Sequence, residues 1–342
     1  MTAARSRGNV TTRSLVAYIL LAHALAWLVS LPLWLGPGLR QPVLVAVVGA
    51  IMMFTPTAAT LLVLRRGERR PWRELARTVG LGVGRSPGRL FAWLGLVAAA
   101  VYVVVLGATL TSTLLGQFDL DPGFSGMAEL LRQQGAAPQG IPLGLMAALL
   151  LGAALLNGAI NTIPALGEEI GWRGFLFPEL QARFGTGAAL VATGIIWGLW
   201  HAPLILLGYN YPLHPVLGLL AFCVVCTLLT GILAWVRQRS GSVWPAAYGH
   251  GLFNALFGTA LLVFQRAGAE VDALHGTVLG WSGWPVPVIL VAALLIAGAY
   301  TPLSPNRASS AGASRSPRLD ATARRQPTAR SAYDRRGSAP LE

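Results

Sequence analysis

Long apolar stretches alternate with short polar segments along the sequence as far as about residue 300. A helix needs about 20 mostly apolar residues to cross a hydrocarbon core about 30 Å thick. About eight stretches reach or approach that length, at residues 14–35, 42–64, 90–115, 141–163, 187–208, 215–236, 243–264 and the shorter 285–300. The pattern therefore predicts an all-α fold, a polytopic transmembrane helix bundle of about eight spans.

Composition supports a membrane location. Hydrophobic residues make up 54% of the sequence and charged residues 11%, whereas a soluble domain carries about 25% charged residues. The excess of 26 Lys and Arg over 13 Asp and Glu is not interleaved with aromatic residues as on a nucleic-acid-binding domain. We therefore expect membrane lipid, and no nucleic acid, as a partner.

Every basic residue is arginine, and glycine and alanine are abundant. This composition indicates a high-GC bacterial genome, and the membrane is then expected to be the plasma (inner) membrane.

The positions of the arginines predict the orientation of the bundle. With about eight spans, one side of the membrane receives the N-terminus, the segment 65–89 and the tail, while the other receives Arg40, Arg132 and Arg266. Cytoplasmic loops carry the excess of arginine, so both termini are predicted to be cytoplasmic. Residues 301–342, rich in Arg, Ser, Pro and Ala, are predicted to be a disordered tail. Residues 1–300 then form the membrane-embedded helical domain.

The polar segment 65–81 has an amphipathic character. It combines several arginines with Trp72, Leu75 and Val79, a composition typical of a helix that lies on the cytoplasmic lipid surface. A solvated basic loop is the alternative.

Polar residues in apolar spans are costly, at about 2.5–3.5 kcal/mol for a charged group, and here they gather between Glu168 and Asn254. On a helix, Glu169 and Arg173 are four residues apart and can form an ion pair. Glu168 lies about 100° away around the helix axis, without such a cation, and is a candidate general base for activating water. An ordinary Glu–Arg pair at a cytoplasmic helix end is the alternative.

Two further pairs have the same four-residue spacing. Trp197 and His201 share a helix face, as do His250 and Asn254. A histidine can transfer protons, and an imidazole beside a carboxamide can donate two hydrogen bonds to one oxygen, as an oxyanion site requires. Taken singly, His201 could be a packing residue, and His250 and Asn254 could hydrogen-bond neighbouring helices. Together, the three groups supply a base, a proton donor and an oxyanion site, which is what amide hydrolysis needs.

Three motifs on membrane segments, EExxxR, aromatic-xxxH and HxxxN, occur in an order typical of the CPBP family of intramembrane proteases. Their residues are Glu168, Glu169, Arg173, Trp197, His201, His250 and Asn254. The chain therefore resembles this family, which contains CAAX-processing endopeptidases and bacteriocin-immunity (Abi-like) homologues. The core of the resemblance runs from about residue 161 to 257. The family more often has phenylalanine in place of Trp197.

The resemblance implies an intramembrane endopeptidase acting on a peptide or protein substrate, and it implies a role for each motif residue. Glu168 would activate the hydrolytic water, assisted by His201. The Glu169–Arg173 pair would maintain the site. His250 and Asn254 would form the oxyanion pocket.

The cofactor is left open by the resemblance, because the family is named for metalloproteases but is also viewed as glutamate-dependent. Two histidines and a glutamate could bind zinc, and the candidate ligands are Glu168, His201 and His250. However, the sequence has no HExxH motif, and the residues four positions from the histidines, Trp197 and Asn254, are not typical ligands. We therefore expect a site without a permanently bound cofactor. A divalent metal such as zinc is the alternative.

A geometric conflict follows from the predicted spans. If the span 141–163 is straight, Glu168 lies near the cytoplasmic face, whereas His201 lies about 21 Å along its helix from Gly187. A kink at Pro164, or a span shifted to about residues 153–177, would bring the two to one depth.

Two other classes of function remain open. A non-catalytic immunity or scaffold protein could have this fold and act by binding. A proton-coupled transporter could use the same charged residues, but it would be expected to contain inverted repeats, and the sequence shows none.

Overall fold

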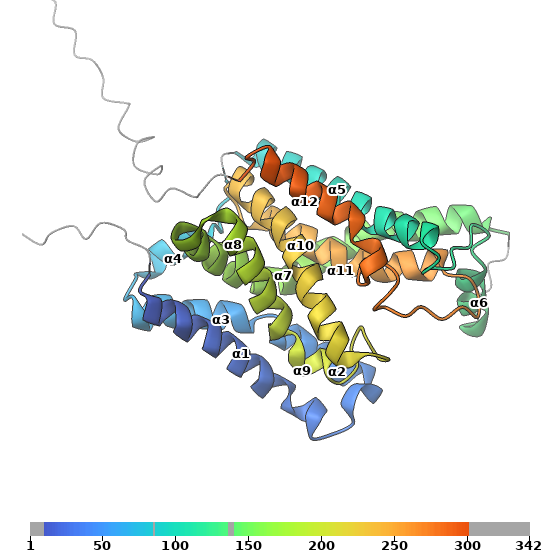
Figure 1. Cartoon of the computed structure of the whole chain (residues 1–342), viewed down its shortest axis with the longest axis horizontal. Coiled ribbons are helices and arrows are strands. Elements are labelled where there is room, and N and C mark those ends of the chain that lie inside the picture. The colour runs from blue at the N-terminus through green and yellow to red at the C-terminus, as the bar shows by residue number, and fades with distance from the viewer. Residues whose placement is uncertain (1–9, 85, 136–139, 301–342) are drawn as a thin grey trace, which may run out of the picture. The chain divides into compact units, whose positions relative to one another are not determined.

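The structure, a computed structural model, describes residues 10–84, 86–135 and 140–300, and Figure 1 shows how their helices are arranged. No β-strand occurs within these ranges. The long helices are α1 (Thr12–Trp34), α5 (Pro87–Leu114), α7 (Leu143–Gly171), α8 (Phe177–Trp200), α10 (Pro215–Ser240) and α11 (Trp244–Phe264). The shorter helices are α2 (Pro42–Met52), α3 (Thr55–Leu62), α4 (Trp72–Val79), α6 (Ser125–Gln133), α9 (Ala202–Ile205) and α12 (Pro285–Ile296). The prediction of an all-α helix bundle is confirmed.

Six helical segments in the described part of the chain are long and apolar enough to cross a membrane. One of them, Leu143–Trp200, is 58 residues long and overlaps two of the predicted stretches, 141–163 and 187–208. Its helix is broken at Gly185, where φ is 78° and ψ is 174°, a conformation that favours glycine because it has no Cβ. The last predicted stretch corresponds to α12, a shorter apolar helix of 12 residues.

A multi-pass membrane protein is therefore confirmed. The number of spans, the plasma membrane location and the cytoplasmic location of the termini remain predictions. The predicted disordered tail, residues 301–342, lies outside the described residues, so the boundary of the membrane domain at residue 300 is also still a prediction.

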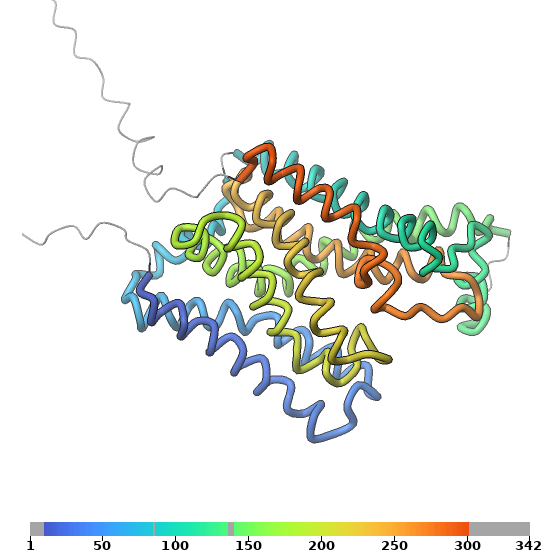
Figure 2. Tube along the Cα trace, in the orientation of Figure 1, coloured from blue at the N-terminus to red at the C-terminus, as the bar shows by residue number. Residues whose placement is uncertain are grey.

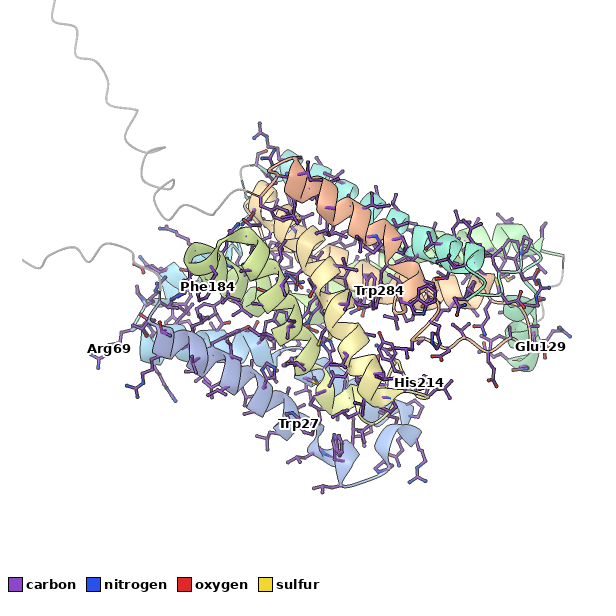
Figure 3. The ribbon with its side chains drawn as sticks, viewed as in Figure 1. Trp27, Arg69, Glu129, Phe184, His214 and Trp284 are labelled. Atoms are coloured by element: carbon purple, nitrogen blue, oxygen red, sulfur yellow. The ribbon has the colours of Figure 1, made fainter. Side chains whose placement is uncertain are left out.

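The helix that contains Glu168 extends well beyond the predicted end at residue 163. It continues through Pro164 to Gly171, then through a π-helical turn, η3 (Trp172–Leu176), and into the first part of α8. Figure 2 shows this continuous course and the reversal that follows it, and Phe184, the last residue before Gly185, is labelled in Figure 3. Glu168 thus lies about 25 Å before the reversal and His201 about 24 Å after it. The conflict in depth disappears, because the helix is longer than hydropathy predicted.

Small residues allow α7 and α11 to pack in close contact, and the two helices lie side by side (Figure 1). A Cβ atom on Gly251 would lie 2.7 Å from the carbonyl carbon of Asn161, and one on Gly158 would lie 2.8 Å from the Cα of Leu252. The backbones therefore touch, as small residues permit in membrane helices. This contact brings the HxxxN helix to the EExxxR helix.

Helices α8 and α10 are held equally close at Gly194. A Cβ atom there would lie 2.1 Å from Oγ1 and 2.3 Å from Cα of Thr227. We expect Gly194→Ala to force the helices apart and to lower the free energy of unfolding by about 1–3 kcal/mol, measured by denaturation of the purified protein in detergent. Gly187→Ala on the same helix is the matched control, because a Cβ at Gly187 would meet no atom within 4 Å. Equal losses in the two variants would show that close packing at Gly194 is not the cause.

Helix α4 lies within the amphipathic segment 65–81, and its apolar residues differ in exposure. Trp72 is 62% exposed, whereas Leu75 and Val79 are buried. A Cβ on Gly174, in the π-helical turn, would lie 2.9 Å from the Cβ of Val79, so the apolar face of α4 packs against the protein. The turn beside the EExxxR motif therefore covers Val79, while the location of the segment 65–81 on the lipid surface stays a prediction.

Candidate active site

Glu168 lies in the last turn of α7 and is almost fully buried, with 2% of its surface exposed. Its Oε2 atom accepts hydrogen bonds from Trp197 Nε1 over 2.6 Å and from Trp172 Nε1 over 3.2 Å. Trp172 comes from the next turn of the same helix, and Trp197 from α8. Both indoles donate to the same oxygen, Oε2. The other oxygen, Oε1, accepts no hydrogen bond from any residue that the structure describes. The carboxylate is thus fixed through one oxygen, and the other is left for chemistry.

Glu169 and Arg173 form the ion pair that their spacing predicts. The distance from Arg173 Nη1 to Glu169 Oε1 is 2.7 Å, and neither side chain is exposed. Arg173 also donates from Nη2 to Thr230 Oγ1 of α10 over 3.2 Å, and its guanidinium lies 4.1 Å from the centre of the Trp197 ring. A buried cation is stabilised by such a ring face as well as by its carboxylate. The pair therefore links α7, α8 and α10.

His250 joins this ion pair from α11. Its Nδ1 lies 2.9 Å from Glu169 Oε1, and its side chain is 4% exposed. Since a carboxylate can only accept, Nδ1 carries the proton, and Nε2 is the nitrogen available for chemistry. The expected oxyanion role needs a donor at Nε2. His250 can supply it only as the imidazolium, whose positive charge Glu169 would face.

His201 follows the last residue of α8 and is half-buried. Its Nδ1 lies 2.9 Å from the backbone oxygen of Trp197, to which it donates, so Nε2 is again the available nitrogen. The imidazole packs edge-on against Trp200 and Phe222, each with ring centres 4.7 Å apart. His201 is therefore held in place by packing and by one backbone contact.

Trp197 connects these groups. Its ring centre lies 5.2 Å from that of His250 and 5.9 Å from that of His201, while its Nε1 holds Glu168. From its spacing alone, Trp197 was expected to be an aromatic neighbour of His201. In the structure it contacts both histidines and also the candidate base.

Asn254 does not join the hydrogen-bonded network. It lies one helical turn from His250 but is exposed, and its side chain has no hydrogen bond within the part of the chain that the structure describes. The structure thus brings together Glu168, Glu169, Arg173 and His250, places His201 beside Trp197, and leaves Asn254 at the surface of the bundle.

Two residues of the network were not predicted from the sequence. Trp172 stands four residues after Glu168, so the same spacing argument that paired Glu169 with Arg173 could have found it. Thr230 gives no such signal, because a threonine in an apolar span is common and its contact with Arg173 depends on how α10 packs.

The candidate metal ligands do not form a metal site in this conformation. Glu168, His201 and His250 were the candidate ligands in the alternative with a metal, but no group of three or more His, Cys, Asp or Glu side chains that could hold a metal ion occurs in the described ranges. The indole of Trp197 packs against both imidazoles. The arrangement therefore does not fit a bound zinc ion as it stands.

The fold and the cluster define a polytopic membrane protein with an enclosed, hydrogen-bonded Glu/Arg/His site, and comparison with known proteins shows what this site resembles. Residues 137–256 match the family model described as Rce1-like, type II CAAX prenyl endopeptidase. A segment of 44 residues is 48% identical to CAAX prenyl protease 2 of Methanococcus maripaludis, covering 13% of this chain and 16% of that protein. All of the motif residues, from Glu168 to Asn254, lie within the segment that the family model matches. The resemblance to the CAAX proteases is confirmed over that segment.

Proposed function

We propose that this protein is an intramembrane endopeptidase of the CAAX-processing kind, which hydrolyses a peptide bond with water activated by Glu168. The observation that supports this most directly is the fixed, buried carboxylate, with two indoles on Oε2 and Oε1 left open. A positioned carboxylate of this kind is suited to act as a general base. The match to an Rce1-like model and the likeness to a protein named CAAX prenyl protease 2 support the reaction class.

In the proposed reaction, Glu168 Oε1 removes a proton from water, whose oxygen attacks the carbonyl carbon of the substrate. The charge that develops on the carbonyl oxygen is stabilised by the Nε2–H of His250, in its imidazolium form, and by the N–H of the Asn254 carboxamide. The carbon–nitrogen bond then breaks, and the proton taken by Glu168 passes through His201 Nε2 to the leaving amine. The Glu169–Arg173 pair orients His250 throughout.

Every proton transfer in this scheme uses a group of the chain itself. We therefore propose that hydrolysis proceeds without a resident metal ion, in keeping with the donor geometry described above. The expected result is that incubation with a chelator leaves the rate of cleavage unchanged. Loss of cleavage with a chelator, and its recovery on addition of zinc, would contradict this and would imply that Glu168, His201 and His250 rearrange around the ion.

The test of the proposed function is cleavage by the purified protein in liposomes. Quenched-fluorescent peptides, one set lipidated at a cysteine near the C-terminus and one set plain, would show which class is the substrate. We expect cleavage of at least one set and its loss in Glu168→Ala and His250→Ala. Absence of cleavage in every set would favour the binding-only role of an immunity or scaffold protein, which should survive Glu168→Ala.

A further inference from the structure

Two asparagines of α7 lie in a membrane-spanning helix and have no part in the proposed reaction. Asn157 is exposed, and its side chain has no hydrogen bond among the described residues, while Asn161 is half-buried and donates from Nδ2 to the backbone oxygen of Asn157 over 2.9 Å. Leu156 and Ile160, beside them, are each 71% exposed. A carboxamide among exposed apolar side chains costs free energy unless it has a polar partner. We therefore expect these two asparagines to bind a polar ligand.

Asn157, Asn161 and Glu168 lie on one stripe of α7. At 100° per residue, the three positions fall within about 40° of one another around the helix axis, and Asn157 is about 16 Å from Glu168 along it. Exposure falls along this stripe, from exposed at Asn157 to half-buried at Asn161 and buried at Glu168. The stripe is thus a polar path from the surface of the bundle to the candidate base.

Helix α11 forms the other side of this path. Its backbone at Gly251 touches that of Asn161, and the exposed Asn254 lies one turn beyond His250. Glu168 and His250 both contact Trp197, so the polar stripes of α7 and α11 face the same side of the helix pair. Asn254 therefore flanks the same path as the two asparagines of α7.

We propose that Asn157 and Asn161, here called the asparagine strip, bind the backbone of an extended substrate segment and guide it past Asn254 to Glu168. This inference rests on the proposed peptidase function. An extended chain in apolar surroundings must satisfy its N–H and C=O groups, and a carboxamide offers both donors and an acceptor. Since an extended chain advances about 3.3 Å per residue, the roughly 16 Å from Asn157 to Glu168 accommodate about five residues. The strip therefore selects substrates with an extended segment of that length on one side of the cleaved bond.

The test uses peptides lengthened one residue at a time on either side of the bond that the wild-type protein cleaves in liposomes. For the wild type, kcat/KM should rise with length on one side only, up to about five residues. In Asn157→Leu, the ratio of kcat/KM for the longest peptide to that for the shortest should fall about three- to tenfold, as expected for the loss of one hydrogen bond. The fall should appear mainly in KM, and Asn157→Gln should restore part of the ratio.

Ile160→Leu is the control, because Ile160 is exposed on α7 but lies off the strip, and it should keep the wild-type ratio. An unchanged ratio in Asn157→Leu, or an equal loss of rate for peptides of every length, would overturn the inference and leave the proposed function intact. A wild-type protein that is folded yet cleaves no peptide would overturn both.

Discussion

Replacing Glu168 with glutamine is expected to reduce the rate of peptide cleavage by about 10²–10⁴-fold. Glutamine keeps the size of the side chain and still offers an oxygen to the indoles of Trp172 and Trp197, but it cannot take a proton from water. The fold should therefore persist. The measurement is the cleavage rate in liposomes, together with the thermal unfolding of the variant in detergent, which should be close to that of the wild type.

Trp197→Phe is the matched control, because it alters the same hydrogen bond from the donor's side. Phenylalanine keeps the aromatic contacts with Arg173, His250 and His201 and loses only the N–H group that Glu168 accepts from. Cleavage should fall about tenfold, the effect of one hydrogen bond to a charged group, and should remain measurable. If Glu168→Gln lost no more activity than this control, Glu168 would not be the base.

Replacing Arg173 with leucine is expected to lower the free energy of unfolding by about 3–5 kcal/mol, because it leaves the buried Glu169 carboxylate without its cation. The two side chains are fully enclosed, so water cannot take the place of the guanidinium. The loss of the contacts with Thr230 and the Trp197 ring adds to the effect. Chemical denaturation in detergent would measure it, with the yield of folded protein as a second readout.

Arg132→Leu provides the comparison for this second prediction. Arg132 also pairs with a glutamate of its own helix, at 2.6 Å, but its side chain is 62% exposed. Exposed pairs of this kind contribute about 0–1 kcal/mol, so the change should be small. A similar small change in Arg173→Leu would mean that burial of the Glu169–Arg173 pair has no consequence for stability.

Hydropathy predicted the helices well, because an apolar stretch of spanning length can be recognised without knowing which helices pack beside it. It failed at the end of α7, where Glu168, Glu169 and Arg173 look like residues that have left the membrane. Their partners are Trp197 of α8, Thr230 of α10 and His250 of α11. These contacts depend on how the helices pack, and packing is not visible in the hydropathy of one helix.

The candidate site shows the same division between local and distant contacts. Spacing alone gave the Glu169–Arg173 pair, because both residues lie on one helix face. Spacing also placed His250 beside Asn254, but it could not show that one is buried against Glu169 and the other exposed. That difference follows from the position of α7, which covers part of α11.

The ion pair at the centre of the site has a consequence for the biosynthesis of the protein. Glu169 and Arg173 are four residues apart, whereas His250 reaches Glu169 across 81 residues of chain. During insertion, Glu169 and Arg173 can neutralise each other within one helical segment, which lowers the cost of placing these two charges in hydrocarbon before the later helices are made. The segment can thus enter the membrane before α11 is made, whereas the contact of His250 with Glu169, and with it the complete candidate site, forms only once α11 has been inserted beside α7.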